Sequence, residues 1–180
     1  MVREAKLVQT ATGLEPDGEG WFVVNASEAC WWQNETFGAH CGFEGETRFP
    51  ELGINLHVLR PGQPNCMYHG ESLQEDFLVL AGECLLLVEG QERRLEAWDF
   101  VHCPSWTEHV FVGSGTGPCV ILMVGGRQPT DEVRYPVAEV ARKHGAGVEK
   151  ETPLPSEAYA PFPSWTRAAF REGDLPGIVG

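Results

Sequence analysis

Positive charge is scarce in this chain. Its 180 residues hold 13 lysines and arginines against 26 aspartates and glutamates, which gives a formal net charge of −13. Nucleic acids and anionic membrane surfaces are bound through positive patches on a protein. The composition therefore predicts a protein that binds neither, and the acidic excess is typical of a charged, water-exposed surface.

Long apolar runs and closely paired cysteines are also missing. No run approaches the roughly 20 apolar residues of a membrane-spanning helix, and residues 1–6 lack the apolar core of a secretory signal. The six cysteines are scattered, and none forms a C-x-x-C pair. We therefore expect buried thiols in a reducing compartment rather than disulfides, and a cytoplasmic protein.

The rest of the composition is that of a folded domain. The chain is 42% hydrophobic and 22% charged, and its length suits a single domain over residues 1–180. It contains 21 glycines and 13 prolines, which favour many short strands joined by tight turns.

A series of strands is expected in the middle of the chain. Apolar and polar residues alternate with period two from Gly53 to Leu59, as in a half-buried strand. Further strands are expected at 77–80, 83–88, 91–95, 100–103, 109–112 and 119–124. Turn residues separate these strands and no helical pattern interrupts them. The order predicts an all-β fold, an antiparallel jelly-roll barrel over residues 51–125.

The first 50 residues are expected to form an arm that carries two strands, at 21–24 and 29–33. The arm either covers the outside or edge of the barrel or pairs with a neighbouring subunit. Trp21, Trp31 and Trp32 give it more aromatic surface than the edge of one barrel needs. Adding a strand to a partner's sheet would cover an edge that otherwise invites aggregation, so we expect a homodimer with two-fold symmetry.

Residues 126–180 are expected to form a C-terminal extension with two short helices. Pro136 at a helix start and Gly145 at its end predict the first helix, over 136–144. Ser164 as a cap and Gly173 as a stop predict the second, over 164–173. The proline-rich segments between them, 152–156 and 160–163, are expected to be extended linkers.

Candidate site residues lie at the two ends of the strand series. His69, Glu71 and Glu75 precede a strand that ends at Gly82, and a second run leads through Pro104 to His109. In this order and spacing they resemble the two signature motifs of the cupin superfamily, over about residues 52–125. The resemblance implies a small β-barrel, which in this superfamily often holds one metal ion.

The match to the two motifs is incomplete. Counting from Gly62 places Tyr68 and Gly70 at the two histidine positions of the first motif, whereas a shift by one residue places His69 and Glu71 there. Both alignments stay open at this point. In the second motif, Trp106 replaces the glycine and Gly113 replaces the asparagine, and the interval from Pro104 to His109 is kept.

The resemblance implies a metal site made of His69, Glu75 and His109. Two histidines and one carboxylate with open positions suit Fe(II), Mn(II), Ni(II) or Zn(II) better than calcium. His69 and Glu71 are two residues apart and project to the same face of an extended strand, so Glu71 would be a fourth ligand or a catalytic proton acceptor. The alternative is a hydrogen-bonded His69–Glu71 pair without a metal ion.

Three further residues are candidates for the cavity or for a second metal site. His57 shares a strand face with Asn55 and would either line the cavity or be a surface or core histidine, and the second role is favoured. His102 and Cys103 face opposite ways on one strand, so simple packing is favoured over a joint metal site.

Two classes of function follow. The chain is either a metal-dependent dioxygenase or isomerase acting on a small organic molecule, or a non-catalytic barrel that binds a sugar-like ligand without metal. A fold alone does not choose between them. No nucleophile elbow or phosphate-binding loop is present, so hydrolase and nucleotide-binding motifs are not indicated.

Overall fold

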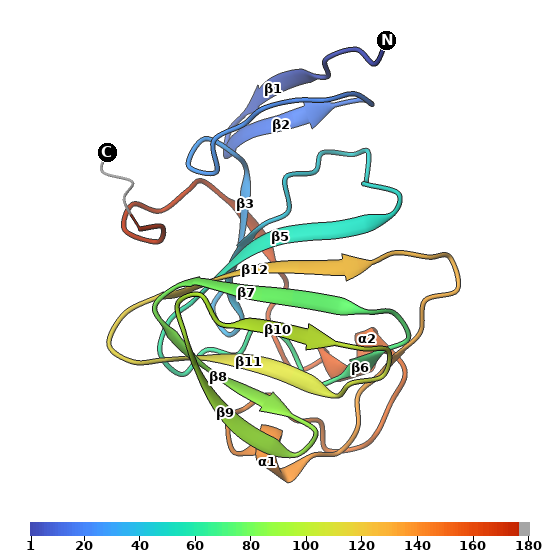
Figure 1. Ribbon diagram of the computed structural model, residues 1–180, viewed down its shortest axis with the longest axis vertical. Coiled ribbons are helices and arrows are strands. Elements are labelled where there is room, and N and C mark those ends of the chain that lie inside the picture. The colour runs from blue at the N-terminus through green and yellow to red at the C-terminus, as the bar shows by residue number, and fades with distance from the viewer. Residues whose placement is uncertain (177–180) are drawn as a thin grey trace.

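The computed structural model describes residues 1–176, and strands dominate it (Figure 1). The N-terminal strands are β1 (Lys6–Thr10), β2 (Gly13–Asp17), β3 (Trp31–Asn34) and β4 (Gly38–Cys41). The central strands are β5 (Leu52–Leu59), β6 (Gly70–Glu71), β7 (Glu75–Ala81), β8 (Glu83–Val88), β9 (Gln91–Glu96), β10 (Phe100–Cys103), β11 (His109–Ser114) and β12 (Cys119–Gly126). The C-terminal elements are β13 (Val133–Arg134), α1 (Glu139–Arg142), α2 (Pro155–Ala158) and β14 (Thr166–Ala168).

Two antiparallel sheets face each other and enclose the core. The larger has the order β10-β7-β12-β5-β4-β3-β14, and the smaller has the order β11-β8-β9. Side chains from both fill the space between them: Leu59, Phe77, Val79, Cys84, Leu86, Cys103, Phe111, Cys119, Ile121 and Met123. This is a jelly-roll barrel, and the predicted fold class is confirmed.

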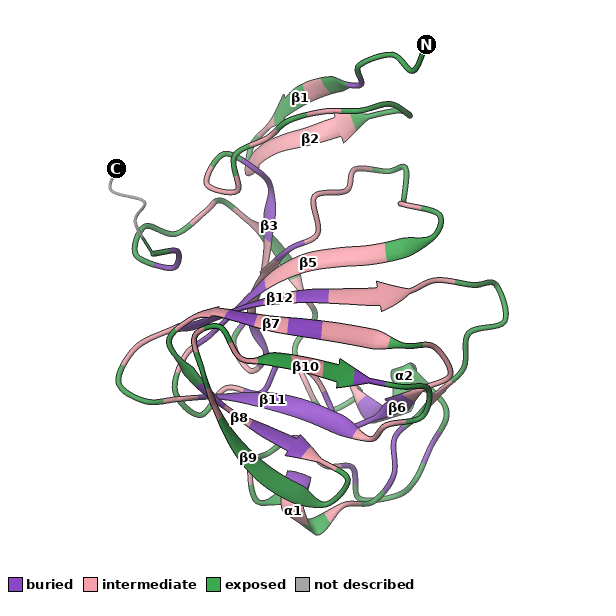
Figure 2. Ribbon diagram, in the orientation of Figure 1, coloured by how far each residue is buried: buried purple, intermediate pink, exposed green. Residues whose placement is uncertain are grey.

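Strand β11 shows why parts of the sequence are apolar without alternation. All its residues from His109 to Gly113 are buried (Figure 2). Phe111 points into the barrel core, whereas Val110 and Val112 pack with Ala141 of α1 on the other face of the small sheet. A strand covered on both faces needs apolar side chains on both. The helix therefore accounts for the continuous apolar run.

The N-terminal arm differs from the prediction in three ways. Residues 21–24 are not a strand, and only an isolated bridge joins Trp21 to Glu4. The predicted second strand is present as β3, but it pairs with β4, a strand that was not predicted. Together they extend the large sheet next to β5, in agreement with the alternative in which the arm covers the edge of the barrel. A hairpin of β1 and β2, which was not predicted, projects beyond the sheet (Figure 1).

The C-terminal extension has two short helices, as expected, but the second is misplaced in the prediction. Helix α1 lies inside the predicted 136–144, and residue Ala138 before it is extended. The predicted helix at 164–173 is wrong: Thr166–Ala168 is strand β14, paired with β3. Arg167 stacks over the ring of Trp32 at 5.3 Å, so pairing with an available strand outweighs the local helix signals.

Helix α2 occupies a segment that was predicted to be an extended linker. Pro155 is its first residue, and in the first turn of a helix a proline costs no intrahelical hydrogen bond. Its Ala158 is buried beside Phe37 and Met67. The prolines at 153 and 155 therefore mark a helix start and not only an extended chain.

Backbone geometry explains two positions of the motifs. Gly82 has φ +73°, and a Cβ there would lie 2.4 Å from the Pro118 carbonyl oxygen, so only glycine fits. Trp106, which replaces the motif glycine, has φ +67°. The left-handed conformation is thus kept although the residue is not glycine. The amide of Trp106 donates to the Glu71 carbonyl at 2.6 Å, which ties this turn to the strand that carries Glu71.

The cysteines and the helices of residues 1–176 bear on the expected free thiols and on the expected lack of a membrane-spanning helix. All six cysteines are free thiols, and five of them are buried. No helix of this part of the chain is both long and apolar enough to cross a membrane.

Candidate metal centre

His69 and His109 lie directly opposite each other on neighbouring antiparallel segments. The amide of His69 donates to the carbonyl of His109 at 3.2 Å, and the amide of His109 donates back at 2.8 Å. Residues paired in this way project their side chains to the same side. The two ring centroids are accordingly 5.2 Å apart.

This pairing decides between the two alignments of the first motif. Tyr68, next to His69, packs on the other side, in the cluster that includes Leu87 and Val110. Its hydroxyl oxygen accepts a hydrogen bond from the backbone amide of Gly90 at 3.2 Å. His69, and not Tyr68, therefore faces the barrel interior with His109.

Both imidazoles are held in the orientation that a metal ligand needs. Nδ1 of His69 donates to the Met67 carbonyl at 2.8 Å, and Nδ1 of His109 donates to the Thr107 carbonyl at 3.0 Å. A carbonyl oxygen only accepts, so each Nδ1 carries the hydrogen. Once Nε2 is free of a proton, as metal binding requires, each ring offers its Nε2 lone pair to the site.

Two carboxylates complete the cluster. Oε2 of Glu75, at the start of β7, lies 3.4 Å from Nε2 of His109. Oε1 of Glu71, on β6, lies 3.3 Å from Nε2 of His69. Ligand atoms of His69, Glu75 and His109 all lie within 4.8 Å of one another. The structure thus brings together the three residues that the sequence named, with Glu71 beside them.

The close packing of these groups shifts their pKa values. Burial raises the pKa of Glu75 to about 7, and the charge of Glu71 adds to this. Burial and the nearby His69 lower the pKa of His109 to about 4. Burial opposes protonation of His69, but Cys66, Glu71 and Glu75 together raise its pKa well above the usual value. Burial also opposes ionisation of Glu71, yet its hydrogen bond to His69 keeps its pKa low.

The donor set fits a divalent transition metal. Two imidazole nitrogens and one carboxylate oxygen surround one point, and Glu71 lies within reach as a fourth group. Three protein ligands leave coordination positions for another molecule, as in catalytic metal sites. A site whose ligands are all oxygen atoms would favour calcium or magnesium. The two histidine ligands therefore argue against those ions.

A pocket of about 430 Å³ opens beside the cluster. It is lined by His69, Glu71 and Glu75 and also by His40, Asn55, His57, Asn65, Cys66, Met123, Arg127, Asp131, Tyr135, Tyr159 and Trp165. His57 was predicted as a possible lining residue of the cavity, and it lines this pocket. His40 was not predicted to lie here because β4 has no clear pattern in the sequence, and Trp165 was not because its segment was predicted to be a helix.

His102 and Cys103 do not form a joint site. His102 is exposed and its Nδ1 lies 2.7 Å from Oδ1 of Asp76, whereas Cys103 is buried in the barrel core. Cys103 is thus the one of the two that packs in the core, and His102 pairs with Asp76 at the surface.

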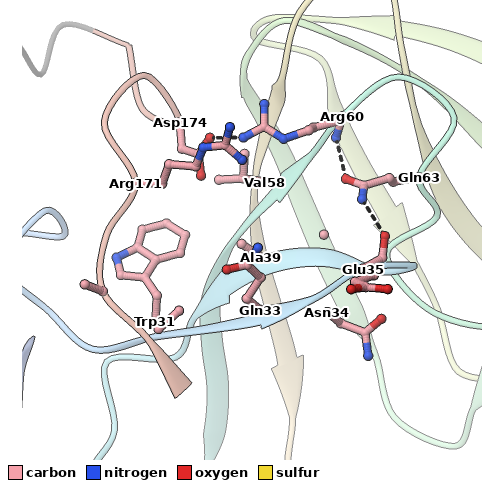
Figure 3. Close-up of a pocket in the computed structure, with 13 residues that line it drawn as sticks. Trp31, Gln33, Asn34, Glu35, Ala39, Val58, Arg60, Gln63, Arg171 and Asp174 are labelled. Atoms are coloured by element: carbon pink, nitrogen blue, oxygen red, sulfur yellow. Dashed lines mark hydrogen bonds and ion pairs between the residues drawn. The ribbon is translucent and has the colours of Figure 1, made fainter. Parts of the chain in front are cut away.

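A second pocket, of about 230 Å³, lies between β3, β4, β5 and the C-terminal segment (Figure 3). Its polar groups largely satisfy one another. The Arg60 guanidinium donates a hydrogen bond to Asp174 at 2.6 Å. The side chain of Gln63 accepts a hydrogen bond from the backbone amide of Arg60 and donates one to the Glu35 carbonyl. The Arg60–Asp174 contact holds the C-terminal segment against the sheet, and we assign this pocket a structural role.

The fold and the cluster define an antiparallel barrel with a histidine and carboxylate cluster in its interior. Residues 55–125 match the family model of the cupin domain, a segment that runs from β5 to β12. The match places residues 55–125, and with them the barrel, in the cupin superfamily. No curated protein matches the chain.

Solved structures similar to the chain include two proteins named for sugar phosphates. A candidate sugar phosphate isomerase from Acidithiobacillus ferrooxidans is 30% identical over 46% of this chain and 55% of that one, with a TM-score of 0.45. The chain thus spans little more than half of that relative. A cupin-superfamily sugar phosphate isomerase from Silicibacter pomeroyi is 20% identical over 76% of this chain and 82% of that one, with a TM-score of 0.49.

A third similar structure is a dioxygenase. The salicylate 1,2-dioxygenase from Pseudoaminobacter salicylatoxidans, solved with gentisate, is 22% identical over 43% of this chain and 20% of that one, with a TM-score of 0.39.

Proposed function

We propose that this cupin binds one divalent transition metal ion, Fe(II), Mn(II), Ni(II) or Zn(II), through His69, Glu75 and His109. A small organic molecule would occupy the adjoining pocket. The observation that carries the proposal is the convergence of three ligand atoms within 4.8 Å, with both imidazoles fixed by backbone carbonyls. We further propose dioxygenase or isomerase chemistry, as used by other members of the superfamily.

In this proposal each residue has a defined task. The metal, when bound, would polarise an oxygen of the ligand as a Lewis acid. In the metal-free protein His69 lowers the pKa of Glu71, and the position of Glu71 beside the cluster would let it accept a proton from a bound ligand. Burial of both imidazoles limits the access of water to the same point.

One observation favours the rival function, a metal-free binding barrel. The contacts from His69 to Glu71 and from His109 to Glu75 satisfy these groups in pairs without an ion. In that case the pocket would hold its ligand through hydrogen bonds alone.

Metal analysis separates the two functions. The full chain is purified without chelator, and its metal content is measured by mass spectrometry before and after incubation with Fe(II), Mn(II), Ni(II) or Zn(II). We expect one ion per chain. A protein that takes up none of the four ions would rule out the metal-dependent function and leave the binding barrel.

Association and location stay predictions. Trp31 is buried in its own chain and β3 pairs with β14, so the arm offers less free surface than the sequence suggested. Trp21 remains half-exposed. We propose a homodimer, tested by sedimentation, for which a mass near the 19.9 kDa of one chain would be the contrary result. The six free cysteines support a cytoplasmic location.

A further inference from the structure

The wall of the pocket formed by β4 and β5 carries polar side chains that the metal site does not use. His40 and His57 are cross-strand partners, and their ring centroids are 5.8 Å apart. Asn55 precedes His57 by two residues on β5 and so shares its face. Trp165 lies edge-on to both rings, at centroid distances of 4.6 Å from His40 and 6.0 Å from His57.

These side chains keep hydrogen-bonding capacity that residues 1–176 do not satisfy. Oδ1 of Asn55 is buried and has no hydrogen-bond partner among them. Nε2 of His57 donates to the Phe37 carbonyl at 2.8 Å, which leaves Nδ1 as an acceptor. Neither ring nitrogen of His40 has a partner within the same part of the chain. Of these open groups, Oδ1 of Asn55 is the buried one. Buried polar groups are nearly always paired, so this oxygen indicates a ligand that donates, and the open imidazole nitrogens beside it would accept from the same ligand.

The wall formed by β4 and β5 offers no free positive charge to an anionic ligand, and the positive groups of this pocket, His69 and the proposed metal ion, belong to the metal centre. Arg127 is the one lysine or arginine among the described lining residues, and its guanidinium is bound to Glu44 and to the Phe49 carbonyl. The carboxylates of Glu71, Glu75 and Asp131 also line the pocket. Burial lowers the pKa of His40 to about 3 and that of His57 to about 4, so both rings are neutral near pH 7. A phosphate or carboxylate would find no free cation on this wall.

We propose that His40, Asn55 and His57, together with Trp165, form a recognition subsite for an uncharged molecule with several hydroxyl groups, such as an unphosphorylated sugar or a cyclic polyol. Hydroxyl groups would donate to Oδ1 of Asn55 and to the free imidazole nitrogens. The carbon-bound face of the ligand would rest against the aromatic rings. The pocket volume of about 430 Å³ falls in the usual range for small ligands. The subsite deepens the proposed function, because it names the ligand class of the same pocket.

Calorimetric titration of the full chain tests this subsite. The probes are neutral hexoses, pentoses and myo-inositol, and each hexose is compared with its phosphate monoester. We expect at least one neutral probe to bind saturably and its phosphate ester to bind at least about tenfold more weakly. Asn55→Leu and His40→Phe should each weaken the neutral probe about tenfold, since each removes hydrogen-bond acceptors while keeping similar volume.

The control variant is His102→Phe, which changes an exposed histidine outside the pocket and should bind as the wild type does. Circular dichroism and thermal melts verify that each variant is folded. The proposal is overturned if no neutral probe binds, if the phosphate ester binds more tightly, or if both pocket variants bind like the wild type.

The titrations are run on metal-free and on manganese-loaded protein, so that two failures can be told apart. If only the metal proposal fails, no ion is taken up, but the metal-free protein still selects the neutral probe through Asn55 and His40. If only the subsite fails, the protein holds one ion per chain, and the two variants leave probe binding unchanged.

Discussion

Replacing His109 with alanine is expected to abolish metal binding at micromolar metal concentrations. His109 is almost fully buried, its Nδ1 is fixed by the Thr107 carbonyl, and its Nε2 is one of three converging ligand atoms. Loss of a residue that only supports a ligand already costs about 10- to 100-fold in metal affinity. Loss of the ligand itself should therefore cost more than about 100-fold, measured by competition with a chromophoric chelator.

Two comparisons guard this result against a folding defect. His109→Gln fills more of the space beside Phe77 and Phe111 and should lose the metal as alanine does. His102→Ala removes an exposed histidine and should bind metal like the wild type. Retention of one tightly bound ion by folded His109→Ala would show that the ion sits elsewhere.

The change Glu75→Gln is expected to weaken metal binding and to stabilise the metal-free protein. Burial raises the pKa of Glu75 from 4.5 in the unfolded chain to about 7. The folded protein therefore holds a proton that the unfolded chain releases, and the wild type loses stability as pH rises from about 4.5 to about 7. Glutamine has no such titration. At pH 8 the variant should be more stable than the wild type by roughly 2–3 kcal/mol.

Chemical denaturation of metal-free protein at pH 4.5 and pH 8 measures this effect. The difference in unfolding free energy between Glu75→Gln and the wild type should be small at pH 4.5 and favour the variant at pH 8. Metal affinity of the same variant should fall by more than about 100-fold, because an amide is a poor substitute for a carboxylate ligand. A variant that is less stable than the wild type at both pH values would contradict the assigned burial of this carboxylate.

The barrel was predictable because its strands are local patterns. Alternation in 53–59 and the turn residues between later strands mark β5 and β7–β12 closely. The arm and the extension were not predictable in the same way. Thr166–Ala168 becomes a strand only because β3 presents an edge to it, and β4 has no clear period of its own. Pairing between strands far apart in the chain cannot be predicted from the local sequence pattern alone.

In the candidate site, too, some residues could be located from local sequence and others only from the tertiary structure. The interval from Glu75 to Gly82 spans β7, and the interval from Pro104 to His109 spans the turn between β10 and β11. Both are local features, so a resemblance in sequence located these residues. The alignment of His69 required the structure, since only its pairing with His109 shows which side chain faces inward. His40 reaches the pocket from β4, a strand that was not predicted, and Trp165 reaches it from a segment that was predicted to be a helix. Their role depends on the tertiary arrangement alone.

Anomalous X-ray diffraction from crystals of the full chain grown with manganese tests the metal centre most directly. Data collected on both sides of the manganese absorption edge locate the ion without reference to any assumed ligand. We predict one anomalous peak per chain, within coordination distance of Nε2 of His69, Nε2 of His109 and a carboxylate oxygen of Glu75. A barrel interior without a peak, or a peak bound to other side chains, would contradict the proposed centre.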